Sequence, residues 1–500
     1  MLELVGIGIA SRFTGRILEA VAGFATTALA VRLLGTSRYG TLALALAIVA
    51  LVGVVGRLGL GVATTRRIAA MRATGDQNGI EQTAQAVTTL MISLAALGSV
   101  LVAGLIYLTH RDQGAAASLL VGTGLGLFLL GVNTSVAGAS IAQGMGRMVL
   151  MEAPRLALVF LQLLAAVVLT VLGVADTVAL ALGFGAAGLV TCVVTRQLIR
   201  GILFGAKHLF RPAARHAIEL VILAAPYAVA AVGTQVISRF DVLVLGFTDT
   251  SAAVGGYEST LRLVDAFLLL IPGVLIAPFV PAATVLFTRG DSTPFGDLYI
   301  FVSKLAFIGT MPAILALVAF PEATLRALFG ADYQVAEPIV WILLAGYAVN
   351  LAFGLNSQAL IAAGQRRRLA RTYLISLTLM VGLAFALIPG LGATGAALST
   401  ACSYVVLNVG VGLALFRSTG VSPFRRDMVV LLLTSVLPVI SVLVVRRAVV
   451  NPGVLWVLVS SLGCWVLWVG IGVWTRAIVL SQLLQLIPRT RRSQEREIAE

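Results

Sequence analysis

Long apolar segments decide what this chain can fold into. About fourteen stretches of roughly 20 residues or more carry very little charge, and this is the length that an α-helix needs to cross the hydrocarbon core of a bilayer. The composition agrees, because 59% of the residues are hydrophobic, only 11% are charged, and the mean hydropathy is +1.03. The sequence therefore predicts an all-α polytopic membrane protein. The predicted spans are 9–34, 39–64, 82–108, 115–140, 154–174, 177–199, 216–247, 254–287, 298–320, 336–362, 371–390, 392–416, 427–448 and 453–476.

The basic residues are distributed unevenly between the loops. They gather in alternate loops, for example at Arg66 and Arg67 and again at Arg366, Arg367 and Arg368. The intervening loops hold only Arg38, Arg111, Arg326, Arg446 and Arg447. Cytoplasmic loops of membrane proteins are enriched in Arg and Lys, so this asymmetry predicts that both termini are cytoplasmic and that the number of spans is even. The loops thus account for the net charge of +14, and we expect no nucleic-acid partner.

The segment YESTLRLVDAF, from Tyr257 to Phe267, is unusual for so apolar a chain. Its Glu258, Arg262 and Asp265 are spaced i, i+4 and i+7, so they lie on one face of the expected helix. A charge inside a membrane must be hidden in protein or face a water-filled space. Glu258 precedes Arg262 in the favourable i, i+4 order, so the two can partly neutralise each other. We interpret this stripe of charges as part of a wet cavity.

Further charges lie within other predicted spans. Arg16 and Glu19 are in the first span, Arg57 is in the second, and Arg239 and Asp241 are in the seventh. Since Arg239 and Asp241 are two residues apart, they point to different sides of a helix and at least one needs a partner elsewhere. Guanidinium groups suit phosphate through bidentate hydrogen bonds and weak hydration. We therefore predict a cationic cavity with these candidate substrate-binding residues: Arg16, Glu19, Arg57, Arg239, Asp241, Tyr257, Arg262 and Asp265.

Two pairs of segments indicate an internal duplication. IAQGMGR (141–147) is similar to IAAGQRR (361–367), and LGFGAAGLVT (182–191) is similar to LGATGAALST (391–400). Six spans separate the copies, so the two halves would have the same orientation. The predicted organisation is a first lobe at 1–199, a cytoplasmic linker at 200–215, a second lobe at 216–416, an extra helix pair at 427–476 and a basic cytoplasmic tail at 477–500.

Several segments resemble the polysaccharide flippases of the multidrug/oligosaccharidyl-lipid/polysaccharide exporter superfamily. RLLGTSRYGTLALALAIVALVGVVGRLGLG (32–61) is similar to the opening of those proteins, with an Arg-x-Leu-Gly turn, a Tyr-Gly and a later Leu-Gly-Leu-Gly. The second half carries RFDVLVLG (239–246), VGGYESTLRLVD (254–265) and APFVPA (277–282). GATGAALSTA (392–401) resembles the twelfth span of the family. The resemblance covers residues 1 to about 416 and fits the polysaccharide branch better than the others.

Membership of that family implies two six-helix lobes forming a V around a central cavity. It also implies alternating access that moves a lipid-linked oligosaccharide from the cytoplasmic to the outer leaflet of the cell membrane. A polyprenyl-diphosphate-linked glycan is the expected substrate, with membrane lipids and other polysaccharide-assembly proteins as further partners. We expect no cofactor, no enzymatic activity and a bacterial source, and we leave coupling to an ion gradient open.

Other functions are weighed against this one. A drug/cation antiporter would need an acidic cavity, which the arginines oppose, and a peptidoglycan-precursor flippase fits the motifs less well. A membrane polymerase or ligase generally needs a large external loop, and the longest predicted external loop is short (321–336). A scaffold without transport would not need charges deep in several spans.

Some patterns are interpreted as structural only. Gly183, Gly185 and Gly188 spell G-x-G-x-x-G inside an apolar span, so we interpret them as helix-packing glycines. The three histidines have no metal-like spacing, and no phosphate-binding G-x-x-x-x-G-K-[ST] loop is present. Cys192, Cys402 and Cys464 lie far apart in apolar runs and are interpreted as packing residues.

Overall fold

The computed structural model describes residues 2–110, 114–203, 214–288, 292–330, 333, 337–447 and 453–474. Within these ranges the chain is helical and has no strand, as predicted. The predicted tail at 477–500 and residues 204–213 of the predicted linker lie outside them. The helices are α1 (Leu2–Arg57), α2 (Leu60–Thr74), α3 (Gln77–His110), α4 (Ala115–Gly144), α5 (Met148–Val171), α6 (Thr177–Ile202), α7 (Ala214–Ile237), α8 (Phe240–Thr248), α9 (Ser251–Thr288), α10 (Ser292–Ala319), α11 (Pro321–Phe329), α12 (Glu337–Phe353), α13 (Asn356–Ala362), α14 (Arg366–Thr419), α15 (Arg426–Thr434), α16 (Val436–Arg447) and α17 (Val454–Trp474).

Two helices are too long for a single crossing. At 1.5 Å per residue, the 56 residues of α1 would extend about 84 Å, against a hydrocarbon core of about 30 Å. Each helix is broken at a glycine with positive φ, namely Gly35 (φ 73°) in α1 and Gly392 (φ 54°) in α14. Glycine adopts this conformation readily because it has no Cβ. Both breaks fall where the predicted spans are separated.

The crossings agree with the predicted topology. Eleven helices of the described chain are long and apolar enough to cross a membrane, and α7 with α8 forms a twelfth, bent by 44°. Since α1 and α14 each fold back at their glycine, the described chain makes about fourteen crossings. One detail differs from expectation. A proline inside a helix usually kinks or breaks it, but Pro272, Pro278 and Pro281 lie within a continuous α9.

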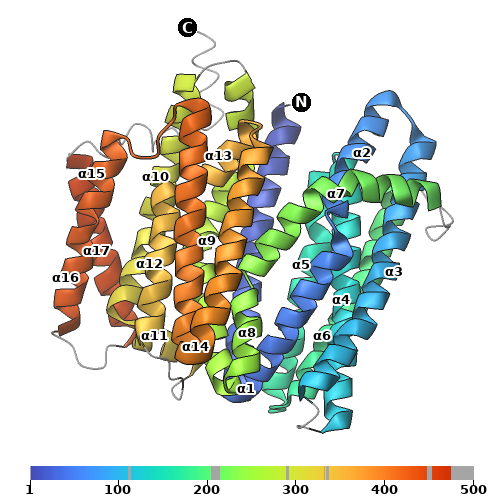
Figure 1. The fold of residues 1–500 in the computed structure, drawn as a ribbon, viewed down its shortest axis with the longest axis horizontal. Coiled ribbons are helices and arrows are strands. Elements are labelled where there is room, and N and C mark those ends of the chain that lie inside the picture. The colour runs from blue at the N-terminus through green and yellow to red at the C-terminus, as the bar shows by residue number, and fades with distance from the viewer. Residues whose placement is uncertain are drawn as a thin grey trace.

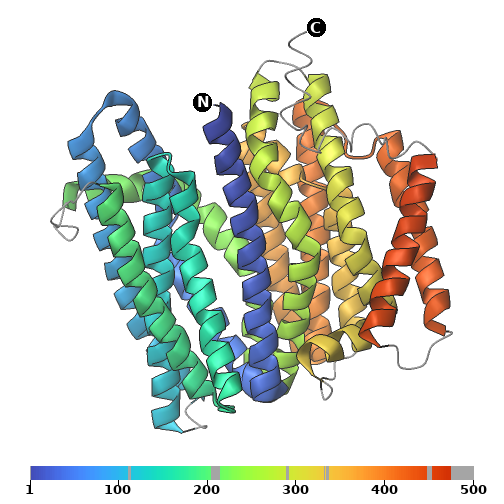
Figure 2. The same cartoon turned by 180° about the vertical axis from the view of Figure 1, so that it is seen from behind.

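The helices form two groups that diverge toward one end of the molecule (Figures 1 and 2). Helices α2–α6 make the first group and α8–α14 the second, with α1 and α7 between them. The charges of α1 are counted with the first group, because Glu19 pairs with Arg155 of α5 and Arg57 with Asn133 of α4. We call the end where α1 begins the N-terminal end, and the end where α1 bends at Gly35 the kink end. At the kink end, one cluster of buried apolar side chains runs through both groups. Toward the N-terminal end each group has its own cluster, which matches the divergence of the ribbons.

The contact between α1 and α9 closes the kink end. A Cβ on Gly40 would lie 1.7 Å from the carbonyl oxygen of Ser251, and a Cβ on Gly255 would lie 1.9 Å from that of Thr36. Only glycine permits the two backbones to approach so closely. The start of α9 is therefore level with the residues that follow the kink of α1.

The predicted boundary at residue 216 does not coincide with a break in packing. The first turns of α7 belong to the first group, because Leu220 and Ala224 are buried in the same cluster as α2 and α3. Glu219 of α7 also forms an ion pair with Arg67 of α2. The sequence predicted Arg67 as part of a basic loop; in the structure it lies within α2 and ties α7 to the first group. The division into two lobes at this boundary stays a prediction.

The last helices pack on the outer side of the second group. They lie at the edge of the molecule, beyond α10 and α12 (Figure 1). In α10, Pro312 has no N–H to offer the carbonyl of Ile308 four residues earlier. The indole of Trp465 in α17 donates to that carbonyl at 2.8 Å, and Lys304 of α10 pairs with Asp427 of α15 at 2.7 Å. Polar bonds as well as apolar contact thus attach these helices.

The predicted repeat appears as a repeated turn, with a shifted register. Helices α4 and α13 are both followed by a turn that contains a glycine of positive φ, Gly146 (φ 73°) and Gly364 (φ 70°). The two turns have the same pattern of backbone hydrogen bonds. The amide of Arg147 donates to Ala142, and the amide of Gln365 donates to Leu360. The two turn glycines are 218 residues apart, whereas the sequence alignment separates the copies by 220.

The glycines of the G-x-G-x-x-G pattern pack helices, as expected. A Cβ on Gly185 would lie 2.6 Å from the carbonyl oxygen of Gly124, and one on Gly188 would lie 2.5 Å from that of Leu127. These glycines let α6 lie directly against α4.

Candidate functional site

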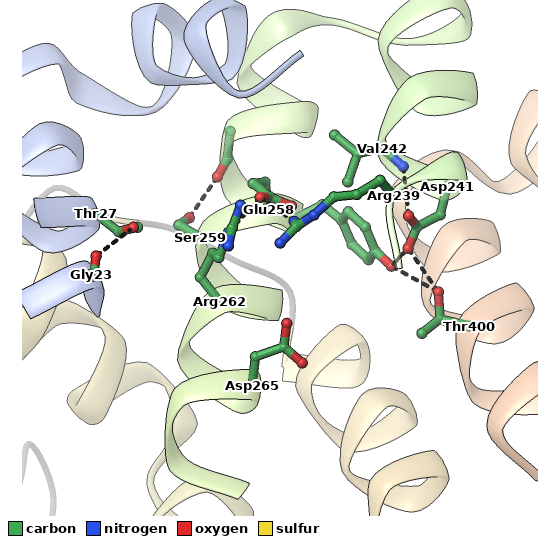
Figure 3. A network of polar contacts seen from close by, with 12 residues as sticks. Gly23, Thr27, Arg239, Asp241, Val242, Glu258, Ser259, Arg262, Asp265 and Thr400 are labelled. Atoms are coloured by element: carbon green, nitrogen blue, oxygen red, sulfur yellow. Dashed lines mark hydrogen bonds and ion pairs between the residues drawn. The ribbon is translucent and has the colours of Figure 1, made fainter. Parts of the chain in front are cut away.

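The break between α7 and α8 places two charges inside the second group. Arg239 precedes α8 and Asp241 lies in its first turn. A carboxylate near a helix N-terminus is favourable because of the helix dipole, and the amide of Val242 donates to Asp241 Oδ1 at 2.8 Å. As the sequence indicated, the two side chains point apart and each finds a partner on another helix (Figure 3).

Glu258 of α9 is the centre of one ion network (Figure 3). Its Oε1 accepts from Arg239 Nη1 at 2.6 Å and from Arg262 Nε at 2.7 Å. The side chains of Arg239 and Glu258 are only 10% and 4% exposed, while that of Arg262 is 37% exposed. Oε2 of Glu258 has no hydrogen-bond partner in the described chain. The expected pair of Glu258 and Arg262 is present, but Glu258 is hidden in protein and does not face a wet cavity.

A second network joins three helices around Asp241. The hydroxyls of Tyr257 in α9 and Thr400 in α14 both donate to Asp241 Oδ2, the latter at 2.7 Å. Asp241 and Tyr257 are each about 1% exposed, so both candidate residues are buried in this structure. The reason is that each completes the hydrogen bonding of the other, which a buried carboxylate requires. A contact of either residue with substrate stays a prediction.

Asp265 completes the stripe of charges. It is partly buried, and the hydroxyl of Tyr347 in α12 donates to its Oδ1. The ring of Tyr347 packs in turn against that of Tyr404 in α14, tilted by 43° with ring centroids 4.8 Å apart. The stripe therefore has three different environments along one helix face, and Arg262, its one cation, has a side chain that is 37% exposed.

The charges of the first group are more exposed. Glu19 lies between Arg16, at 3.4 Å, and Arg155 of α5, at 3.5 Å. The side chains of Arg16 and Arg155 are 53% and 39% exposed. Arg57, which is partly buried, donates to Asn133 Oδ1 of α4 at 3.3 Å. Such long, open contacts restrain the arginines only weakly.

Three of the four candidate arginines, Arg16, Arg57 and Arg262, lie at two depths. From the level of the Gly40–Gly255 contact, helix rise places Arg262 about 10 Å along α9 and Arg57 about 25 Å along α1. Arg16 lies on the other half of α1, about 28 Å from the kink at Gly35. The structure thus brings Arg16 together with Glu19 and Arg262 together with Glu258, but it places these two ion pairs at separate depths.

Sequence reasoning missed several residues of these networks. Arg155, the first residue after Pro154 within α5, was not among the predicted site residues. Asn133, Tyr347 and Thr400 are polar residues within apolar spans, a weak signal by itself. Thr400 had one further signal, because it is the threonine shared by the two copies LGFGAAGLVT and LGATGAALST.

The described residues contain no group of three or more His, Cys, Asp or Glu side chains that could hold a metal ion. The expectation that the protein works without a cofactor stays a prediction.

Comparison with known proteins adds the family. The family described as polysaccharide biosynthesis protein matches residues 5–287. The chain belongs to this family. The match confirms the resemblance inferred from the motifs, and with the many apolar helices it identifies a membrane protein of polysaccharide biosynthesis.

One curated relative is named "Probable low-salt glycan biosynthesis flippase Agl15", from Haloferax volcanii. It is 26% identical over 185 residues, which cover 36% of this chain. The match spans only 38% of the relative's own length.

Solved structures share the fold. The lipid II flippase MurJ in an inward closed conformation has a TM-score of 0.68 and 16% identity, covering 94% of this chain and 100% of that one. An inward-facing transporter of the multidrug resistance MATE family of the MOP superfamily has a TM-score of 0.59 and 17% identity, covering 82% and 94%. At these identities the likeness concerns the fold alone, so this chain shares the fold of these two transporters.

Proposed function

We propose that this protein is a flippase that moves a polyprenyl-diphosphate-linked oligosaccharide from the cytoplasmic to the outer leaflet by alternating access. The family supports a role in polysaccharide biosynthesis, and the fold supports transport. The observation that carries the substrate class is the pair of arginine levels: Arg16 and Arg57 at one depth and Arg262 at another. An arginine within an apolar span costs at least a few kcal/mol by insertion scales. Placing such residues at two depths is what a moving diphosphate requires.

The direction of transport follows from the predicted orientation. We take the N-terminal end as cytoplasmic, because the arginine-rich loops lie there. The two groups of helices diverge toward that end and share a core at the kink end, which supports a state that would receive substrate from the cytoplasm. Arg16 and Arg57 would meet the diphosphate first, and Arg262 would meet it as the lobes rock.

Transport in reconstituted vesicles tests the proposal. Vesicles that contain the full chain and a fluorescent polyprenyl-diphosphate-linked glycan should show time-dependent loss of fluorescence to an impermeant quencher. Protein-free vesicles are the control. Equal rates in both would contradict the flippase function, and cleavage or elongation of the glycan would contradict the proposal that the protein is not an enzyme.

A second candidate is a flippase for a peptidoglycan lipid precursor, favoured by the overall similarity to MurJ. Both substrates carry a lipid diphosphate, so the arginines do not distinguish them. Competition does: an excess of the unlabelled peptidoglycan precursor should leave glycan transport unchanged under the first proposal and abolish it under the second.

The orientation has its own test. Single cysteines at Asp249 and Arg367, both exposed in the structure, are labelled in whole cells with an impermeant reagent. We expect reaction at position 249 and protection at position 367. The reverse pattern would contradict cytoplasmic termini.

A further inference from the structure

Arg262 is held on one side only. Its Nε donates to Glu258 Oε1, and its side chain is 37% exposed. The two terminal amino groups of a guanidinium form the edge opposite this bond, and that edge can give a phosphate two parallel hydrogen bonds. A carboxylate that binds Nε therefore sets the direction in which the phosphate-binding edge points.

Glu258 is itself held in place by a second arginine, Arg239. Arg239, at the break before α8, donates to the same Oε1 at 2.6 Å, and both side chains are buried. Leaving either charge buried without the other would be costly, so the pair is a stable base for Arg262. Oε2 of Glu258 has no partner in the described chain. Because Oε2 can still accept a hydrogen bond, Glu258 can stay bonded to Arg262 when the arginine side chain turns toward a ligand.

We propose that Glu258, held by Arg239, is a positioning residue that orients Arg262 toward the diphosphate of the substrate. This rests on the proposed function. Arg239 and Glu258 were predicted from the sequence as part of a charged cavity, and the structure instead gives them a place behind the binding residue. The competing explanation is an ion pair that only stabilises the contact between α8 and α9.

Paired neutral variants separate the two explanations. The variants are Glu258→Gln, Arg239→Gln and the double variant, with Arg262→Ala as the reference for lost binding. Removing one partner of a buried pair is destabilising, whereas replacing both partners is often close to neutral. The double variant should therefore recover the thermal midpoint of the unmodified protein.

The readouts are thermal unfolding and binding of a fluorescent short-chain polyprenyl diphosphate by the full chain in detergent. We expect the double variant to unfold close to the unmodified protein and still bind the probe at least about tenfold more weakly, the effect of losing one charge-assisted hydrogen bond. Arg262→Ala should weaken binding at least as much.

A matched control comes from α11. Glu322 and Arg326 form the same i, i+4 pair at 2.6 Å, but their side chains are 53% and 44% exposed. Glu322→Gln should change neither readout.

Three outcomes would overturn the inference. If the double variant recovers both stability and affinity, Glu258 and Arg239 are structural only. If Arg262→Ala binds the probe normally, Arg262 is not the residue being positioned. If the unmodified protein, with a normal thermal midpoint, does not bind the probe at all, the proposed function itself fails and the inference fails with it.

Discussion

The two groups of helices hold their membrane charges in opposite ways. In the second group, Arg239 and Glu258 are 10% and 4% exposed and are joined at 2.6 Å. In the first group, Arg16 and Glu19 are 53% and 25% exposed and are joined at 3.4 Å. One network is closed within protein, and the other is open to its surroundings.

This difference teaches what each network can be used for. A closed network is committed to its helices, because any charge taken from it leaves another charge buried and unpaired. An open network is weakly coupled and screened, so its arginines can exchange their carboxylate for a phosphate at low cost. Loss of one member of the buried Arg239–Glu258 pair should therefore reduce stability, whereas substitutions in the open network should reduce transport at little cost in stability.

The largest expected effect is at Arg239. Arg239→Ala leaves Glu258 without its buried partner, and breaking such a pair costs about 3–5 kcal/mol. We expect a marked fall in the thermal midpoint and in the yield of folded protein in detergent. Arg326→Ala, in the exposed pair on α11, is the control. An unchanged midpoint for Arg239→Ala would mean that the second network is not closed.

The next effect is on transport. Arg16→Ala and Arg57→Ala should reduce glycan flipping about ten- to hundredfold, the loss expected for a charge-assisted contact with phosphate. The thermal midpoint should stay close to that of the unmodified protein, since both side chains make only long contacts. Lysine at either position should restore transport only in part, because its ammonium group is a point charge and cannot give phosphate the two parallel hydrogen bonds of a guanidinium.

The exposed Arg66 is the control for this pair of variants, and Arg66→Ala should transport normally. Loss of folded protein in Arg16→Ala or Arg57→Ala would contradict the open character of the first network.

A smaller effect compares the two copies of the repeat. Thr400→Val removes a donor to the buried carboxylate of Asp241 and should cost about 1.5–3 kcal/mol of stability. Its counterpart Thr191 is equally buried but bonds the backbone carbonyl of Ala187. Thr191→Val should cost about 1 kcal/mol or less. Equal losses in chemical unfolding would show that Asp241 does not depend on Thr400.

The smallest effect on stability is expected at Glu19. Glu19→Gln should change the stability by less than about 1 kcal/mol, because its partners Arg16 and Arg155 are exposed. The same change removes the carboxylate that competes with phosphate, so affinity for the short-chain diphosphate probe should rise a few-fold. The rise should disappear in high salt. Weaker binding would indicate that Glu19 orients the arginines.

The sequence by itself determined the crossings, the break at Gly35 between the first two of them, and the ion pair of Glu258 and Arg262 within α9. These features depend on neighbouring residues, since apolar length, glycine φ and i, i+4 spacing are all local. The pair of Glu258 and Arg262 was predictable for this reason.

Only the tertiary structure decided which charges are buried. Arg239 meets Glu258 because α8 turns at the break and packs on α9, and Asp241 meets Thr400 across 159 residues of chain. The tertiary structure also placed the first turns of α7 in the first group, and it showed that the repeated turn is shifted in register. No local pattern contains this information, because whether a charge is buried depends on which helix covers it.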